Sequence, residues 1–74
     1  MSLPEEVKSR LDNDFSYHPP KGDQAERYVE IRDAAKDMAL LICQRCPDSR
    51  ERSVALTHLD NFVMWANASI ARNE

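Results

Sequence analysis

Two long stretches of the chain repeat apolar residues at alternating intervals of three and four positions. In residues 49–72 the repeat comprises Leu56, Leu59, Val63, Ala66 and Ile70. In residues 23–45 it comprises Tyr28, Ile31, Ala35, Met38 and Ile42. These intervals place the side chains on one face of an amphipathic helix. The pattern predicts two long helices, and neither stretch contains a Gly or Pro that would break them.

The connection between the two stretches is short and contains Pro47. A connection of this length makes consecutive helices antiparallel neighbours, so residues 23–46 and 48–73 are expected to form an αα-hairpin. Acidic residues three positions apart resemble capping boxes at both helix starts. These pairs are Asp23 with Glu26 and Asp48 with Glu51.

The N-terminal part of the chain predicts a third, shorter helix. Residues 1–14 begin with Ser2 and Glu5 at capping-box spacing, and they carry a few apolar residues on one side. A helix this short is unstable alone and is expected to dock on the hairpin. A loop, residues 15–22, follows it. The predicted fold is therefore all-α, with one domain spanning residues 1–74.

A second face of the last helix is only half polar. It consists of Val54, His58, Asn61, Trp65, Ala68 and Arg72. One partner helix cannot cover both faces, so the second face needs another subunit or a ligand. Each long helix extends about 35 Å at 1.5 Å per residue, which is long for a monomer of this size. The pattern indicates a homo-oligomer, and Trp65 favours an interface seam because tryptophan is enriched at interfaces.

Composition narrows the possible functions. A net charge of −3 over 74 residues does not support binding of polymeric nucleic acid through a broad basic surface. No apolar run approaches 18 residues, and the first residues lack the apolar core of a signal peptide. We therefore expect no membrane partner and a cytoplasmic location. Two cysteines agree, because secreted proteins of this size usually carry more.

The loop of residues 15–22 is the best candidate for a binding site. Tyr17 and His18 offer ring faces on which a nucleobase can stack, and Lys21 offers a charge for phosphate. Arg32 and Lys36 lie one turn apart on the following helix and are candidates for the same site. The alternative is structural: the aromatic residues only cap the end of the hairpin, and the two prolines only stiffen a linker.

Other chemistry has weaker support. Cys43 and Cys46 form a C-x-x-C pair, but the pair lies at the end of a helix, where the dipole opposes thiolate formation. Zinc would need two further ligands, and His18 and His58 have no ligand-like spacing. Buried structural cysteines are favoured over a metal or redox site. The chain also lacks a recognisable catalytic motif, so we expect no enzyme, no metal and no cofactor.

Three separated segments carry a resemblance to a known family. They are F-S-Y-H-P-P-K, then R-Y-x-x-I-R-D-x-A, then C-P-x-S-R-E-R-S-x-A-L-T-x-L-x-x-x-V-M-W-A-N-A-S-I-A-R-N. In this order, from Phe15 to Glu74, they resemble the phage anti-CBASS cyclic-nucleotide sponges, which share a helical hairpin domain with the anti-Thoeris sponges. The resemblance implies a non-enzymatic homo-oligomer, typically a hexamer. Such sponges sequester the cyclic dinucleotides and trinucleotides, such as cyclic GMP–AMP, of bacterial anti-phage defence and so block effector activation.

The resemblance also implies roles for individual residues. The family's stacking aromatic corresponds to Tyr17, and its phosphate-binding cation corresponds to Arg32, with Lys36 and Lys21 as further candidates. A separate trinucleotide pocket uses several protomers, and the candidates for it are Arg72 with Asp33 or Ala34. The sequence departs from the family pattern after Pro20, at Lys21-Gly22-Asp23, which affects the register of the Arg32 match. The competing hypothesis is a small helical module that binds a protein partner and no nucleotide.

Overall fold

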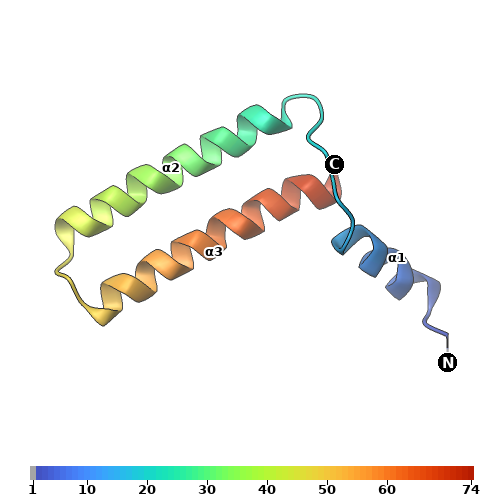
Figure 1. The fold of residues 1–74 in the computed structure, drawn as a ribbon, viewed down its shortest axis with the longest axis horizontal. Coiled ribbons are helices and arrows are strands. Elements are labelled where there is room, and N and C mark those ends of the chain that lie inside the picture. Colours follow the sequence, from blue (N-terminus) through green and yellow to red (C-terminus); the bar gives the residue numbers. More distant parts are fainter. Residues whose placement is uncertain (1) are drawn as a thin grey trace.

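The computed structural model describes residues 2–74 and contains three α-helices. These are α1 (Glu5–Asp14), α2 (Gln24–Arg45) and α3 (Arg50–Asn73). Helices α2 and α3 run antiparallel and form the hairpin, and α1 projects from its open end (Figure 1). The described residues contain no strand. The predicted all-α class and the hairpin are confirmed, whereas Met1, the first residue of the expected segment 1–14, lies outside the described residues.

The start of α3 differs from the expected capping box. Ser49 is the N-cap, and its Oγ accepts a hydrogen bond from the backbone N–H of Arg52 at 3.1 Å. Ser49 has the extended backbone geometry that an N-cap requires. Asp48 lies one residue too early and instead accepts from the Arg52 guanidinium at 3.0 Å. The predicted Asp48–Glu51 capping box is therefore wrong.

The other two predicted capping boxes are also wrong. In the described chain, no side-chain hydrogen bond caps α1 or α2. The N-cap of α1 is Pro4, whose carbonyl accepts from the N–H groups of Val7 and Lys8. The N-cap of α2 is Asp23, whose carboxylate is held by Arg27 one turn further on, at 3.1 Å from Nε. An ion pair along the helix has replaced the expected cap.

The hairpin has no fully buried apolar core. Nine of the ten apolar residues that predicted the two helices are half-buried between α2 and α3, while Met38 is exposed. Within residues 2–74 the only buried residue is Gln24, which is 3% exposed. Large apolar side chains remain in solvent, including Phe62 at 67% and Trp65 at 71% exposure. The two helices cover one face of each other and leave their flanks open.

The shape of the molecule explains this missing core. Its extents are 52 × 34 × 13 Å, and the shortest extent is about one helix diameter of 10–12 Å. The radius of gyration is 16.7 Å, whereas a compact chain of this length has about 11 Å. The accessible surface is 6200 Å², against roughly 4,700 Å² for a compact monomer of this mass. The hairpin is a single layer of helices, and it encloses no interior.

Helix α1 is attached to the hairpin through polar bonds at its C-terminal end. Asn13 Nδ2 donates to the carbonyl oxygen of Arg72 at 3.0 Å. Arg72 in turn lies 3.7 Å from the carboxylate of Asp14 and 3.4 Å from its carbonyl oxygen. The three apolar residues of this segment, Leu3, Val7 and Leu11, stay exposed in the single chain. Helix α1 extends beyond the end of the hairpin (Figure 1), and these apolar side chains are not covered there.

Candidate nucleotide-binding site

The aromatic loop, residues 15–22, is anchored at several backbone points. The Ser16 hydroxyl donates to the carbonyl oxygen of Asp12 in the last turn of α1. His18 Nε2 donates to the carbonyl oxygen of Asn13 at 2.7 Å. At the other end of the loop, the Lys21 N–H donates to Gln24 Oε1 at 3.1 Å. Two consecutive prolines between these anchors restrict the backbone further.

The rings of the aromatic loop point into solvent. Phe15 and Tyr17 are each 85% exposed. In the single chain, therefore, neither ring covers the end of the hairpin as the structural alternative required. Tyr17 combines a free ring face with a position between two anchors of the loop, the Ser16 hydroxyl on Asp12 and the His18 ring on Asn13. This is the arrangement that base stacking needs, because little ordering is left for the ligand to impose.

Below the loop, three side chains join the start of α2 to the end of α3; we call them the terminal clamp. Gln24 Nε2 donates to Glu74 Oε1 at 3.2 Å. Arg27 binds the same carboxylate with two nitrogens, Nη1 at 2.7 Å from Oε2 and Nη2 on Oε1. The hydrogen bond from Arg27, helped by the one from Gln24, lowers the pKa of Glu74 to about 2. The same hydrogen bond raises the pKa of Arg27, so both charges are retained at neutral pH.

Two of the predicted cations lie on one flank of the hairpin. Arg32 and Lys36 line a groove of about 510 Å³ between α2 and α3, which we call the charged groove. Asp60 lies in the same groove, and apolar residues form its floor: Ala35, Ala39, Leu56, Leu59 and Val63. The loop residues Lys21 and His18 line a different hollow, of about 240 Å³, beside the terminal clamp. Within one chain, therefore, Lys21 lies in a different hollow from Arg32 and Lys36.

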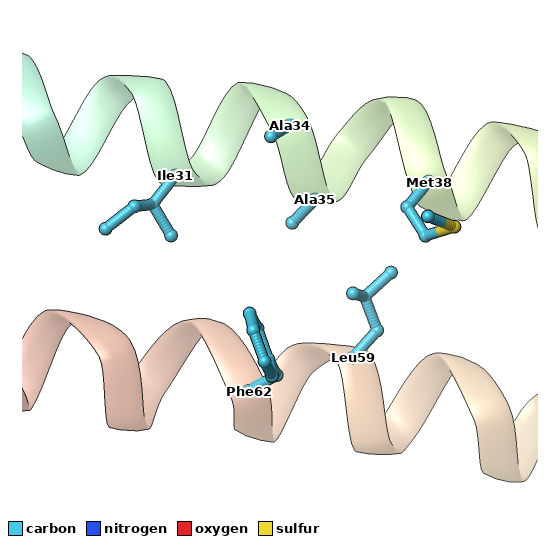
Figure 2. Close-up of a pocket in the computed structure, with 6 residues that line it drawn as sticks. All are labelled: Ile31, Ala34, Ala35, Met38, Leu59 and Phe62. Carbon is cyan, nitrogen blue, oxygen red and sulfur yellow. The ribbon is translucent and has the colours of Figure 1, made fainter.

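The opposite flank of the hairpin carries a purely apolar depression. This apolar hollow, of about 360 Å³, is lined by Ile31, Ala34, Ala35, Met38, Leu59 and Phe62. Figure 2 shows Ile31, Ala35 and Met38 of α2 on the side that faces Leu59 and Phe62 of α3. The site candidate Ala34 lies here, while its neighbour Asp33 is exposed on the solvent side of α2. Apolar lining without a polar group is typical of a surface that packs against protein.

Arg72 lies where α1 meets the end of α3. It lines a hollow of about 390 Å³ together with Trp65 and residues of α1, among them Arg10, Asn13 and Asp14. Four residues of the predicted second face, namely Asn61, Trp65, Ala68 and Arg72, also share an adjoining hollow of about 250 Å³. Ala34 lines neither of these two hollows. Arg72 and Ala34 belong to separate hollows of one chain, so a pocket using both requires two copies.

Comparison with known families agrees with this geometry. A family model described as the Acb2/Tad1 hairpin domain matches residues 8–71. The chain belongs to the Acb2/Tad1 hairpin family. The resemblance to the anti-CBASS and anti-Thoeris sponges is thereby confirmed. No curated protein and no solved structure gave a significant match.

The Acb2/Tad1 match covers most of the structure that has been described. It begins in α1, includes the aromatic loop and α2, and ends at Ala71, two residues before the end of α3. Seven of the eight candidate residues lie inside it: Tyr17, His18, Lys21, Arg32, Asp33, Ala34 and Lys36. Arg72 lies one residue beyond it. The family is a sponge-type binding domain, which agrees with the absence of a catalytic motif in the sequence.

The two cysteines near the hairpin turn of this Acb2/Tad1 domain differ from their expected burial. Cys43 and Cys46 are both free and exposed, so the expected burial is wrong for the single chain. Cys43 lies in the last turn of α2, and Cys46 is the C-cap of that helix. Among residues 2–74 no cluster of three or more potential metal ligands occurs. Nor does any described helix have the length and apolarity needed to cross a membrane.

The terminal clamp is the part of the site region that sequence reasoning missed. Gln24 and Glu74 are 50 residues apart, and their pairing depends on the register of the hairpin. A usable signal existed for the ion pair, because Arg27 and Glu74 have opposite charges and lie near the same end of an antiparallel pair. No pattern signalled Gln24, since a glutamine at a helix start is usually exposed.

Proposed function

We propose that this protein is a non-enzymatic sponge, which binds and sequesters cyclic dinucleotides and cyclic trinucleotides made by bacterial anti-phage defence. Membership of the Acb2/Tad1 family supports a sponge-type binder. Sequestration removes the messenger before it activates an effector, and it requires tight binding without turnover. The protein acts where these messengers are made, in the host cytoplasm, as a homo-oligomer for which the family resemblance suggests a hexamer.

The observation that carries this proposal is the exposed ring of Tyr17 on an anchored loop. Base stacking on an aromatic side chain contributes about 1–3 kcal/mol per base. An anchored backbone preserves more of that energy, because fewer degrees of freedom are lost on binding. His18 fixes the loop through its bond to Asn13, so its ring serves the backbone in addition to any contact with ligand.

The charges support a small anionic ligand. A cyclic dinucleotide carries two phosphates, and Arg32 with Lys36 supplies two positive charges in one groove. In the single chain these cations and the Lys21–His18 pair line different hollows. A second copy would bring another Tyr17 and another pair of cations, which suits a ligand with twofold symmetry. The complete site is therefore expected between protomers.

The uncovered surface supports self-association independently. The chain exposes about 1,500 Å² more than a compact monomer of its mass. A stable interface buries about 800 Å² on each partner, so this excess corresponds to about two contacts. A trinucleotide pocket that combines Arg72 with Asp33 or Ala34, as the family resemblance implies, would then lie between protomers.

Titration calorimetry tests the proposal with cyclic GMP–AMP and cyclic tri-adenylate. We expect both ligands to release heat, and Tyr17→Ala to weaken dinucleotide binding by about 10- to 100-fold, as the loss of base stacking predicts. Phe15→Ala is the matched control, because Phe15 has the same exposure in the same loop. Arg32→Ala tests the phosphate contact. Absence of heat with both ligands, while the oligomer is intact, would refute the sponge.

A second candidate function follows from the apolar hollow. Its lining, with the exposed Phe62, also fits a helical module that binds a different protein. The same calorimetry separates the two functions, since an interaction module gives no heat with cyclic nucleotides. Binding that survives both Tyr17→Ala and Arg32→Ala would instead keep the sponge and reject the site.

A further inference from the structure

The only buried residue in the described chain is a polar one. Gln24 is 3% exposed, at the first position of α2. A buried amide is costly unless its donors and acceptors are paired. The Gln24 amide is paired on both sides: its oxygen accepts from the Lys21 N–H, and its nitrogen donates to Glu74. The side chain thus connects the aromatic loop to the end of α3.

Glu74 is itself held in place by a fixed partner. The Arg27 guanidinium grips both carboxylate oxygens, and Asp23 accepts from the same guanidinium at 3.1 Å. Bidentate contact of this kind defines a geometry as well as a charge pair. The orientation of the Gln24 amide is therefore determined by the end of α3, and the orientation of the Lys21 peptide by the Gln24 amide.

Gly22 makes the anchored turn possible. Its φ of +57° is in the left-handed region, which residues with a Cβ adopt at a cost. The turn directs the chain from Lys21 into α2, so that the Lys21 N–H faces back toward the Gln24 side chain. The path from Pro19 to Lys21 is then fixed relative to the hairpin, and Tyr17 lies four residues before Lys21 on the same restricted segment.

We propose that Gln24, oriented by Glu74 and Arg27, is a positioning residue for ligand binding, because it holds the aromatic loop in its binding conformation. This inference rests on the proposed function. Gln24 does not touch the ligand, and its role is to keep the loop ordered before the ligand arrives. The affinity of a site that is ordered only part of the time falls by the ordered fraction. Loss of Gln24 therefore weakens binding by the same factor by which it loosens the loop.

The test compares two measurements on the same variant. In Gln24→Ala we expect protection of the Lys21 amide from hydrogen exchange to fall about tenfold, and Kd for cyclic GMP–AMP to rise about tenfold, as loss of a hydrogen bond in a buried position predicts. The loss of affinity should come mainly from slower association of the ligand. Gln44→Ala, an exposed glutamine at the other end of α2, is the matched control and should change neither quantity.

A reciprocal exchange distinguishes positioning from general stability. In Gln24→Glu two carboxylates face each other, and we expect a loss at least as large as that of Gln24→Ala. Combining Gln24→Glu with Glu74→Gln exchanges donor and acceptor, and should return both Kd and Lys21 protection to within about twofold of wild type. The thermal midpoint and Trp65 fluorescence report the integrity of the hairpin and should not change in Gln24→Ala. The exchanged pair lacks the Glu74 carboxylate, so it is compared by Kd and Lys21 protection alone.

The outcomes separate this inference from the proposed function. Wild-type affinity in Gln24→Ala, or unchanged exchange of the Lys21 amide, would overturn the positioning role. If Gln24→Ala lowers both the affinity and the thermal midpoint, and the reciprocal exchange does not restore the affinity, Gln24 is a structural residue only. If the wild-type protein binds neither ligand, the sponge function fails, and exchange of the Lys21 amide still decides whether Gln24 orders the loop.

Discussion

The two flanks of the hairpin are built from the same helices, yet they differ in chemistry. The charged groove and the apolar hollow share Ala35 and Leu59 along the line where α2 and α3 meet. On α2, Arg32 lies on one flank and Ala34 on the other. On α3, Asp60 and Phe62 are divided in the same way. Two residues correspond to about 200° around a helix, so a shift of two positions changes the flank.

This difference shows how a chain without an interior separates two tasks. A globular domain places apolar residues inside and functional residues outside. Here both kinds lie at the surface, and the hairpin sorts them to opposite flanks. The apolar hollow is suited to contact with protein, and the charged groove to contact with a small anion. Changes on the charged flank should therefore leave the oligomer intact, whereas loss of the oligomer should also dismantle a site that is shared between protomers. The following predictions test this.

The largest effect is expected on the apolar flank. Phe62→Asp places a carboxylate in an apolar contact surface, where desolvation of an unpaired charge costs several kcal/mol. We expect the oligomer to dissociate, with a mass near the 8.5 kDa of one chain by light scattering. Phe62→Leu, which stays apolar, should retain the oligomeric mass. A wild-type mass already near 8.5 kDa would refute the assignment of this flank to self-association.

The next effect concerns the cations of the opposite flank. Hydrogen bonds to charged groups contribute about 1.5–3 kcal/mol, so Arg32→Ala with Lys36→Ala should raise Kd for cyclic GMP–AMP at least tenfold. The dependence of Kd on salt should become flatter, because two phosphate contacts are lost. The oligomeric mass should not change, and Arg45→Ala is an exposed control on the same helix. A double variant that dissociates would show that the flanks are coupled.

A smaller effect of opposite sign is expected for Asp60. Its carboxylate lies in the groove with Arg32 and Lys36, where it opposes an incoming phosphate. Asp60→Asn removes this charge, and we expect about two- to fivefold tighter binding, consistent with a partly solvated charge worth up to about 1 kcal/mol. The gain should be largest at low salt and be measurable by calorimetry. Weaker binding would instead make Asp60 a ligand contact or an orienting partner for the cations.

The smallest effect concerns the terminal clamp, which lies at the end of both flanks. The pKa of Glu74 is lowered to about 2 in the folded chain from an ordinary 4.5, so its ionised form is stabilised by folding. This contribution is present above pH 4.5 and is lost as the pH falls toward 2. The positive groups that act on this carboxylate are Arg27, through a hydrogen bond, and Lys21, through its charge. The difference in thermal midpoint between wild type and Glu74→Gln should therefore be constant from pH 6 to 8 and shrink at acid pH.

A constant difference down to pH 2, measured by circular dichroism, would remove Glu74 from the stability of the open end. A difference that changes between pH 6 and 8 would assign the effect to another group. Gln24→Ala serves as the comparison, since it alters the clamp without removing a titrating group.

The sequence predicted the hairpin because the pattern that determines it is local. Apolar residues at intervals of three and four specify a helical face, and Pro47 marks the turn between the two helices. Helix starts were predicted less well, since Ser49 and Asp48 are both acceptable caps and only the backbone geometry at Ser49 decides between them. Local spacing does not contain that geometry.

The site was predictable where side-chain chemistry alone identifies it. Tyr17 could be selected as an aromatic residue beside a histidine and a lysine, but its exposure and its anchored backbone required the structure. The separation of Lys21 from Arg32 depends on how the loop enters α2, and the clamp depends on the register between Gln24 and Glu74. These are relations between distant residues, for which a single sequence provides no periodic signal.

The shortest dimension of the hairpin, 13 Å, has a genetic consequence. In the proposed homo-oligomer a chain only one helix thick shares its interior with other copies, so protomers from different alleles would mix within one assembly. A copy that has lost Tyr17 but retains Phe62 would still enter assemblies with intact copies and remove half of each shared site. Such an allele should be dominant when co-expressed, whereas one that has lost Phe62 stays outside the assemblies and should be recessive.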